Sequence, residues 1–230
     1  MFHLHGPALR GGALALLAAV LFGVSTPLVQ HLGAGLGAFS TAALLYAGAA
    51  GMGAVLRKPV QQEARLRRAD TSRLLAMAGL GAVVGPVALA WGLQRTSGSS
   101  ASLMLTLEAL FTALLAWRLY HETMDRRVWA AMLLLLAGGV ALVVDQGRLG
   151  GVELAGLLAV LLATMAWGAD NTLSRALAER DPAQVVLVKA ALGASATALL
   201  AWGLGAILFR YEAPVLGGAF DEGFPHDGVR

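Results

Sequence analysis

The sequence predicts an all-α, polytopic membrane protein with about seven transmembrane helices. Of its 230 residues, 57% are hydrophobic and 13% are charged, whereas a soluble domain carries about 25% charge. The mean hydropathy of +0.69 reflects more apolar surface than one water-soluble core buries, and a bilayer accepts such surface. The charges lie in short segments between apolar runs, which argues against a nucleic-acid partner despite a pI near 9.8.

Seven apolar runs have roughly the 20 residues that a helix needs to cross a bilayer. The predicted spans are residues 11–30, 35–56, 72–93, 99–120, 128–144, 154–173 and 183–208. The remaining segment, 211–230, is rich in Gly, Pro, Asp and Glu, holds no span and is expected to be disordered.

Lysine and arginine residues gather in alternate connections of the predicted bundle. They crowd residues 57–73, 118–127 and 175–180, and are sparse in the other connections. Positively charged loops stay on the cytoplasmic side of a membrane. The pattern therefore predicts a multi-pass protein of the cell (inner) membrane with a cytoplasmic N-terminus and a lipid bilayer as its first partner.

An internal repeat links the first and sixth spans. The spacing from Gly11 to Phe22-Gly23 recurs from Gly156 to Trp167-Gly168, with Leu-Leu-Ala in the same place in both. Five spans separate the two copies, and a tandem repeat of an odd number of spans must be inverted. The sequence thus predicts one five-helix repeat over residues 11–144 and the start of a second over 154–208. Inverted repeats are typical of secondary transporters, whose substrate sites lie between the halves.

With these elements the chain resembles the EamA-like family of the drug/metabolite transporter (DMT) superfamily. The resemblance is carried by the fourth span from Ser100 to Trp117 with His121-Glu122 at its end, by Gly138-Gly139-Val140 in the fifth, and by Trp167-Gly168. It implies a ten-span architecture, from which this chain would be C-terminally truncated, and an exporter of a small metabolite or amphiphile that works by alternating access. The family often has a proline in the middle of span four, where this chain has Glu108-Ala109.

Three ionisable side chains fall well inside predicted spans, where a central charge costs about 2.5–3.5 kcal/mol on insertion scales. Glu108 lies near the middle of span four, and we interpret it as a substrate ligand or proton carrier. The alternative is a protonated, structural glutamate. Lys189 is either a charge partner of Glu108 or Asp170, or a lysine that extends to the nearby membrane surface.

Asp170 and Asn171 follow Trp167 in span six, and we assign all three to the substrate pathway. The repeat aligns Asp170 and Asn171 with Ser25 and Thr26 of span one, which precede Pro27. Proline frees a backbone carbonyl, and interrupted helices at matching positions of two repeats indicate a binding region. Ser25, Thr26 and Pro27 therefore join the predicted pathway. The alternative is that span six ends at Gly168 and Asp170 caps it.

In span three, Gly81 and Gly85 form a pair of small residues that favours close helix packing, and Gly85-Pro86 is a candidate hinge. The chain has no cysteine. It also has no P-loop and no zinc-protease motif, because His121-Glu122 lacks the second histidine. We therefore predict no metal, no cofactor and no enzymatic activity.

The predicted partners are a small-molecule substrate and either a second copy of the chain or a polypeptide that completes the second repeat. Two alternatives remain to the transporter interpretation. One is a non-functional truncated fragment. The other is a seven-helix retinal-binding photoreceptor, suggested by Lys189 in the seventh span.

Overall fold

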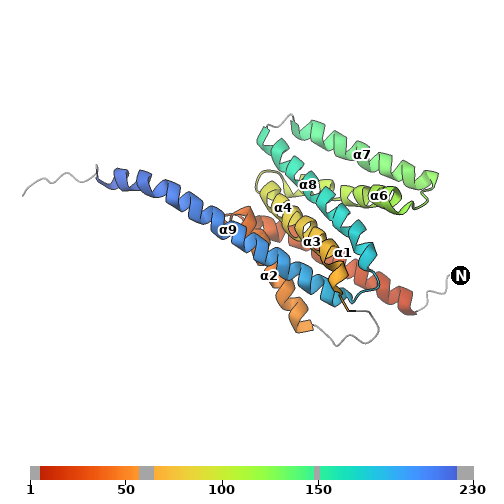
Figure 1. The fold of residues 1–230 in the computed structure, drawn as a ribbon. Coiled ribbons are helices and arrows are strands. Elements are labelled where there is room, and N and C mark those ends of the chain that lie inside the picture. The colour runs from red at the N-terminus through yellow and green to blue at the C-terminus, as the bar shows by residue number, and fades with distance from the viewer. Residues whose placement is uncertain (1–5, 57–64, 148–150, 222–230) are drawn as a thin grey trace, which may run out of the picture.

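The computed structural model of the protein describes residues 6–56, 65–147 and 151–221 (Figure 1). Regular secondary structure within these ranges is helical, and no strand occurs in them. Among the described residues, seven helical stretches are long and apolar enough to cross a membrane. The predicted class, an all-α polytopic membrane protein, is confirmed. Helices suit this environment because they satisfy their own backbone hydrogen bonds where no water is available.

The helices follow the predicted spans closely. They are α1 (Gly6–Leu32), α2 (Ala38–Leu56), α3 (Thr71–Met77), α4 (Gly85–Leu93), α5 (Gly98–Leu105), α6 (Leu107–Tyr120), α7 (Arg126–Gly147), α8 (Gly151–Ser174) and α9 (Pro182–Asp221). A π-helical segment, η2 (Ala78–Val84), joins α3 to α4 within span three, and span four is divided between α5 and α6. Short 3₁₀ turns, η1 (Arg68–Asp70) and η3 (Arg175–Leu177), flank α3 and α8.

Local signals in the connections set where the helices begin and end. The Ser97 hydroxyl caps α5 by accepting a hydrogen bond from the Ser100 amide at 3.1 Å. The Asp125 carboxylate accepts bonds from the Arg127 and Val128 amides, each at 2.9 Å, at the start of α7. His121 has a φ of 53°, a left-handed conformation that ends α6.

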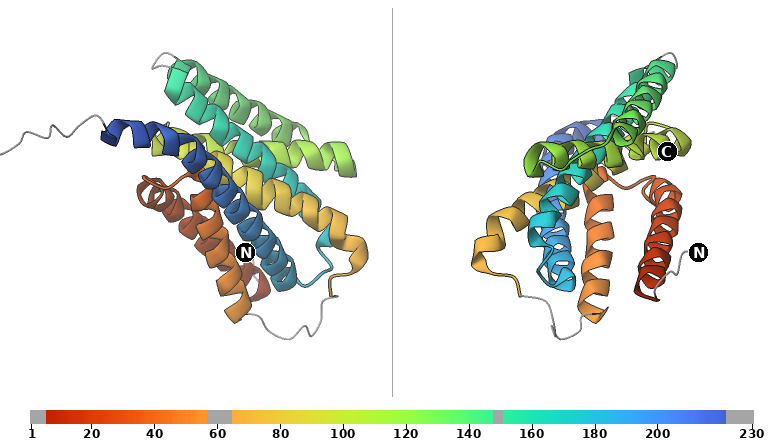
Figure 2. Two further views of the ribbon diagram at one scale, coloured as in Figure 1. Left: turned by 60° about the vertical axis from the view of Figure 1, so that its left-hand side comes forward. Right: turned by 90° about the vertical axis from the view of Figure 1, so that its right-hand side faces the viewer.

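Helix α8 is the centre of the bundle and packs on α4, α5, α6 and α7. Its buried residues Leu157, Val160 and Ala163 join side chains of those helices in the main apolar core. The approach of α8 to α4 is close because glycines face each other: a Cβ on Gly92 would lie 2.7 Å from the Gly156 carbonyl oxygen. Figure 2 shows α8 running between α4 and the α6–α7 pair.

Helix α9 packs on α2 and on η2, and it extends past the rest of the bundle (Figure 1). The sequence predicts an end of span seven at residue 208 and a disordered tail from 211. The structure differs, because α9 is helical to Asp221. Residues 209–213, Phe-Arg-Tyr-Glu-Ala, continue the helix without glycine or proline, and the last part of α9 contains Pro214, Gly217 and Gly218. Residues 222–230 lie outside the described residues.

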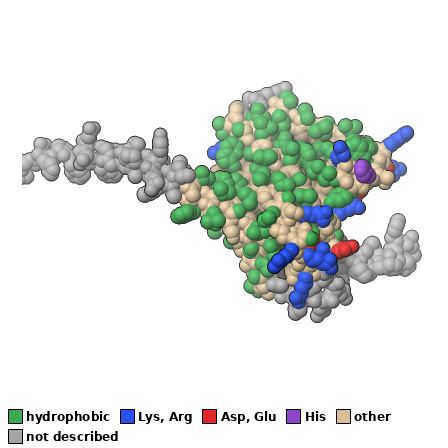
Figure 3. All heavy atoms as spheres, in the orientation of Figure 1, with side chains coloured by type: hydrophobic (Ala, Val, Ile, Leu, Met, Phe, Trp, Pro, Cys, Tyr) green, Lys and Arg blue, Asp and Glu red, His purple; other side chains and the backbone are tan. Residues whose placement is uncertain are grey.

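The outer surface of the helices is apolar. Leu14, Leu134 and Val55 are 67%, 75% and 81% exposed. Figure 3 shows hydrophobic side chains across the visible face, with Lys and Arg gathered toward one end. A broad apolar face with charge at its edge suits a lipid environment.

Candidate functional site

The backbone carbonyl of Gly81 lies at the middle of span three and accepts hydrogen bonds from two other helices. The Tyr46 hydroxyl of α2 donates to it, and Trp167 Nε1 of α8 donates to it at 2.9 Å. The local backbone explains why this oxygen is available. The Gly85 amide bonds to the Leu80 carbonyl, five residues back. In the same register the donor to Gly81 would be Pro86, which has no N–H.

Asp170 and Lys189 form an ion pair beside this carbonyl. The Lys189 ammonium of α9 donates to Asp170 Oδ2, and the two side chains are 19% and 5% exposed, respectively. The other carboxylate oxygen, Oδ1, is buried and has no hydrogen-bond partner in the described part of the chain. A Cβ on Gly81 would collide with this carboxylate, so glycine at that position makes the room that Asp170 occupies.

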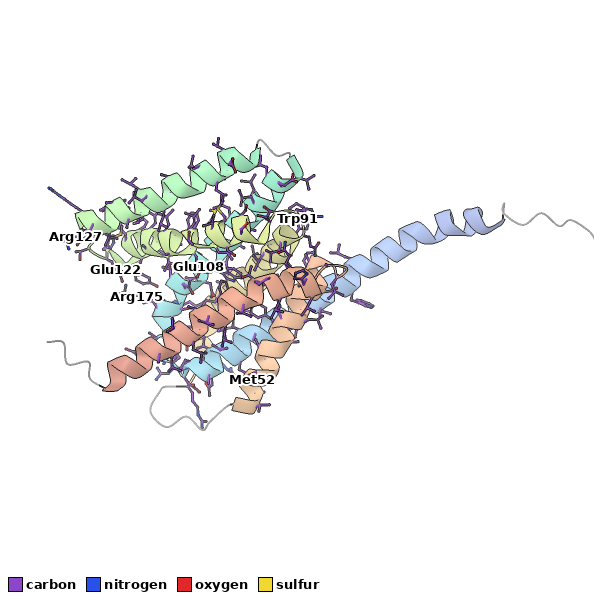
Figure 4. All side chains as sticks on the ribbon, turned by 180° about the vertical axis from the view of Figure 1, so that it is seen from behind. Met52, Trp91, Glu108, Glu122, Arg127 and Arg175 are labelled. Carbon is purple, nitrogen blue, oxygen red and sulfur yellow. The ribbon has the colours of Figure 1, made fainter. Side chains whose placement is uncertain are left out.

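Glu108 and Asn171 meet on the opposite side of α8. Asn171 Nδ2 donates to Glu108 Oε1 at 2.7 Å, and Glu108 is half-buried. Glu108 stands in the first turn of α6, directly after the break at Thr106 that separates α6 from α5. Figure 4 shows Glu108 inside the bundle, between the end with Glu122 and Arg175 and the end with Trp91.

The two polar pairs are neighbours because Asp170 and Asn171 are consecutive on α8. Asp170 turns toward α9 and η2, while Asn171 turns toward α6. Asp170 also interacts electrostatically with Glu108. The arrangement therefore places two carboxyl groups, one ammonium and one amide around a single turn of a central helix.

Ser25, Thr26 and Pro27 lie in an unbroken part of α1. Both hydroxyls donate to the Phe22 carbonyl, at 2.7 Å from Ser25 and 3.3 Å from Thr26. The expected interruption of span one is therefore absent, because hydroxyl bonds hold the turn before the proline. Ser25 lies on the wall of an apolar hollow of about 350 Å³ between α1 and α2.

Trp167 connects α1 to this site. Its ring contacts Phe22 edge-to-face, with centroids 6.1 Å apart and planes at 78°. Its indole N–H binds the Gly81 carbonyl, and a Cβ on Gly85 would lie only 2.5 Å from Trp167 Nε1. Gly85 and Pro86, the predicted hinge, thus follow directly on the π-helical segment, and Gly85 lies against the indole ring.

Two alternatives from the sequence analysis do not hold. Helix α8 does not end at Gly168 but continues to Ser174, with Asp170 buried inside it. Asp170 therefore does not cap the helix. Lys189 does not pair with Glu108, because its ammonium contacts the Asp170 carboxylate.

Sequence reasoning missed Tyr46 and the Gly81 carbonyl. A signal for Tyr46 exists, since it is a lone hydroxyl-bearing aromatic in a span of mostly Ala, Gly and Leu. The sequence indicates the free Gly81 carbonyl only weakly, through Pro86 five residues downstream. No group of three or more His, Cys, Asp or Glu side chains suited to a metal occurs among the described residues.

Comparison with known proteins identifies the family. The model of the EamA-like transporter family matches residues 9–144. A protein of Methanothermobacter thermautotrophicus named "Uncharacterized transporter" is 32% identical over 137 residues, which is 58% of this chain and 40% of that relative. The chain thus matches less than half of the relative's length, and no solved structure matches it. Because the family match covers more than half of the chain, the protein belongs to the EamA-like transporter family.

Proposed function

We propose that the protein is a secondary transporter that exports a small metabolite or amphiphile across the cell membrane by alternating access. The family membership makes a membrane transporter the starting point. The direction and the mechanism are our proposals, as is a cytoplasmic N-terminus, which rests on the placement of Lys and Arg in alternate connections.

Contacts between matching positions support the inverted repeat. Phe22 and Trp167 occupy equivalent places in the two copies, and their rings touch. The equivalent second and seventh spans, α2 and α9, also pack on each other. Equivalent elements meet in this way around a two-fold axis. Such an axis in the membrane plane is where inverted-repeat transporters have their substrate sites.

The observation that carries the proposal is the Glu108–Asn171 pair at the broken middle of span four. An acidic side chain is costly there unless it faces a polar path or a partner. Glu108 is half-buried and Asn171 is exposed, so the pair lies at the edge of the core and not inside it. We assign Glu108 to the midplane as substrate ligand or proton carrier, with Asn171 and Asp170 along the cytoplasmic half of the path.

Transport by everted membrane vesicles tests this assignment. Vesicles from cells that express the chain would be energised with an acid interior and offered radiolabelled amino acids and small amphiphilic amines. We expect gradient-dependent uptake of at least one compound, and loss of that uptake in Glu108→Gln at unchanged expression. Glu179→Gln, an exposed glutamate after α8, is the matched control and should resemble the wild type. Persistence of pH-dependent uptake in Glu108→Gln would show that Glu108 is structural.

A further inference from the structure

We propose that Asp170 is the group that binds and releases the coupled proton, with Lys189 as its built-in counter-ion. Glu108 and Asn171 are then left to contact the substrate on the other side of α8. This inference rests on the proposed transporter function and assigns proton and substrate to two different polar pairs. It rests on the geometry of the buried Asp170 carboxylate, in which one oxygen contacts the Lys189 ammonium and the other has no hydrogen-bond partner among the described residues.

The two oxygens of Asp170 differ in their surroundings. Oδ2 accepts from the Lys189 ammonium, whereas Oδ1 is buried without a hydrogen-bond partner in the described part of the chain. A buried polar atom without a partner is rare in folded proteins and calls for an explanation. Oδ1 accepts a proton without displacing any existing contact, which suits a group that must load and unload during a cycle.

The titratable groups around Asp170 come from three helices. Lys189 of α9 pairs with it directly, and Tyr46 of α2 and Glu108 of α6 interact with it electrostatically. From η2 the neighbour is Gly81, which has no side chain and is too close to admit one. Lys189 is thus the group that balances the Asp170 charge, and the pair is neutral as a whole.

The proton step changes this balance. A proton from hydronium on the acidic side binds Asp170 Oδ1, which releases water and converts the carboxylate to a neutral acid, while Lys189 keeps its proton and its positive charge. The ammonium then lies in an apolar bundle without an anionic partner, which is strongly unfavourable. Relief requires that α8 and α9 shift so that water or another anion reaches Lys189. Release of the proton restores the pair and the original packing.

A movement of α8 and α9 would be transmitted to other helices through hydrogen bonds. Tyr46 and Trp167 bind the same Gly81 carbonyl, and Trp167 is three residues before Asp170 on α8. Movement of α8 would therefore displace the π-helical segment and, through it, α2.

The surroundings of Glu108 differ from those of Asp170, because Glu108 Oε1 accepts a hydrogen bond from the neutral amide of Asn171, an exposed residue. That geometry suits a ligand contact.

Labelling with dicyclohexylcarbodiimide, which modifies protonated carboxyl groups in apolar surroundings, tests the proposal on the purified full chain. Modified residues would be mapped by mass spectrometry across a pH series. We expect Asp170 to be labelled at acidic pH and protected as the pH rises, while exposed Glu179 stays unlabelled. Lys189→Met should speed labelling of Asp170 at alkaline pH by about tenfold or more, because the nearby positive charge is gone. Lys189→Arg should keep the protection.

Two results would overturn the proposal. One is an Asp170 that labels no more than Glu179 in the folded wild type. The other is a pH profile that is the same in wild type and Lys189→Met. If the methionine variant does not fold, the wild-type profile and the arginine variant still decide. The labelling needs no transported substrate, so a failure of vesicle transport would count against the proposed function without touching this assignment.

Discussion

At the residue scale, the site depends on a side chain that is absent. Gly81 lets the Asp170 carboxylate lie against the backbone of η2, and its carbonyl binds both Tyr46 and Trp167. Gly81 thus has two roles: its missing side chain leaves room for Asp170, and its carbonyl accepts hydrogen bonds. Together they set how closely α8 approaches span three. The neighbouring Gly79 has open space around its Cβ position and carries neither role.

Gly81→Ala should therefore destabilise the protein. The added methyl group must displace Asp170 and the Lys189 pair, and overpacking of this kind costs about 1–3 kcal/mol. Gly79→Ala, in the same π-helical segment, should be neutral or slightly stabilising because alanine favours helix. Thermal unfolding of both variants in detergent measures the difference. Equal melting temperatures for the two variants would contradict the close contact between Gly81 and Asp170.

Sequence alone identified the charged members of the site but not the neutral ones. Glu108, Asp170 and Lys189 stand out because a charge inside an apolar span is costly and rare. Tyr46 has no such mark, since the body of a tyrosine is apolar and its hydroxyl finds partners in many places. Which charges pair also depends on helix rotation, and the spans give no information on that. The sequence therefore offers two candidate partners for Lys189, Glu108 and Asp170.

At the element scale, the irregular backbone lies in spans three and four. The sequence predicts an interruption at Pro27 and, as the alternative for span six, a helix end at Gly168, yet α1 and α8 run through both positions. The breaks occur in η2 and at Thr106 instead. Pro86 offers a local reason for the first. At Thr106 the side chain donates to the Leu103 carbonyl at 2.7 Å, within a turn that interrupts the α-helical register. Such hydroxyl-to-backbone bonds are not visible in a hydropathy pattern.

Pro86→Ala tests whether the missing N–H maintains the open carbonyl. The alanine amide would supply a backbone donor for the Gly81 region, which is worth about 1 kcal/mol, and would compete with Tyr46 and Trp167. We expect a higher melting temperature and slower transport. Pro182→Ala, at the first position of α9 where no N–H bond is needed, should change neither. A lower melting temperature for Pro86→Ala would show that the π-helical segment does not depend on the proline.

At the scale of the whole molecule, the spans were predictable because a bilayer demands a fixed apolar length. Each of the seven predicted spans overlaps a membrane-length helical stretch. The packing arrangement of the spans is harder to predict from the sequence, because lipid-facing and protein-facing surfaces are equally apolar. That α8 is central, with α7 largely on the outside, follows from packing of small residues such as Gly156 that hydropathy does not weigh.

The proposed orientation is testable with single cysteines, since the native chain has none. We expect an impermeant maleimide to label Ala34→Cys, between α1 and α2, in intact cells. Glu179→Cys, between α8 and α9, should be labelled only after the membrane is opened. Both positions are exposed, so accessibility across the membrane is the only variable. The reverse pattern would place the N-terminus outside and invert the assigned path.

The measurement that tests the central claim most directly is gradient-driven uptake by the purified chain in proteoliposomes. A pH gradient, acid inside, would be imposed on liposomes that contain only this protein, with the amino acids and amphiphilic amines offered outside. The account predicts accumulation above that of protein-free liposomes, abolished by a protonophore and lost in Glu108→Gln. Flux equal to that of protein-free liposomes for every compound, from a chain that is folded and inserted, would contradict the claim that this polypeptide is a transporter.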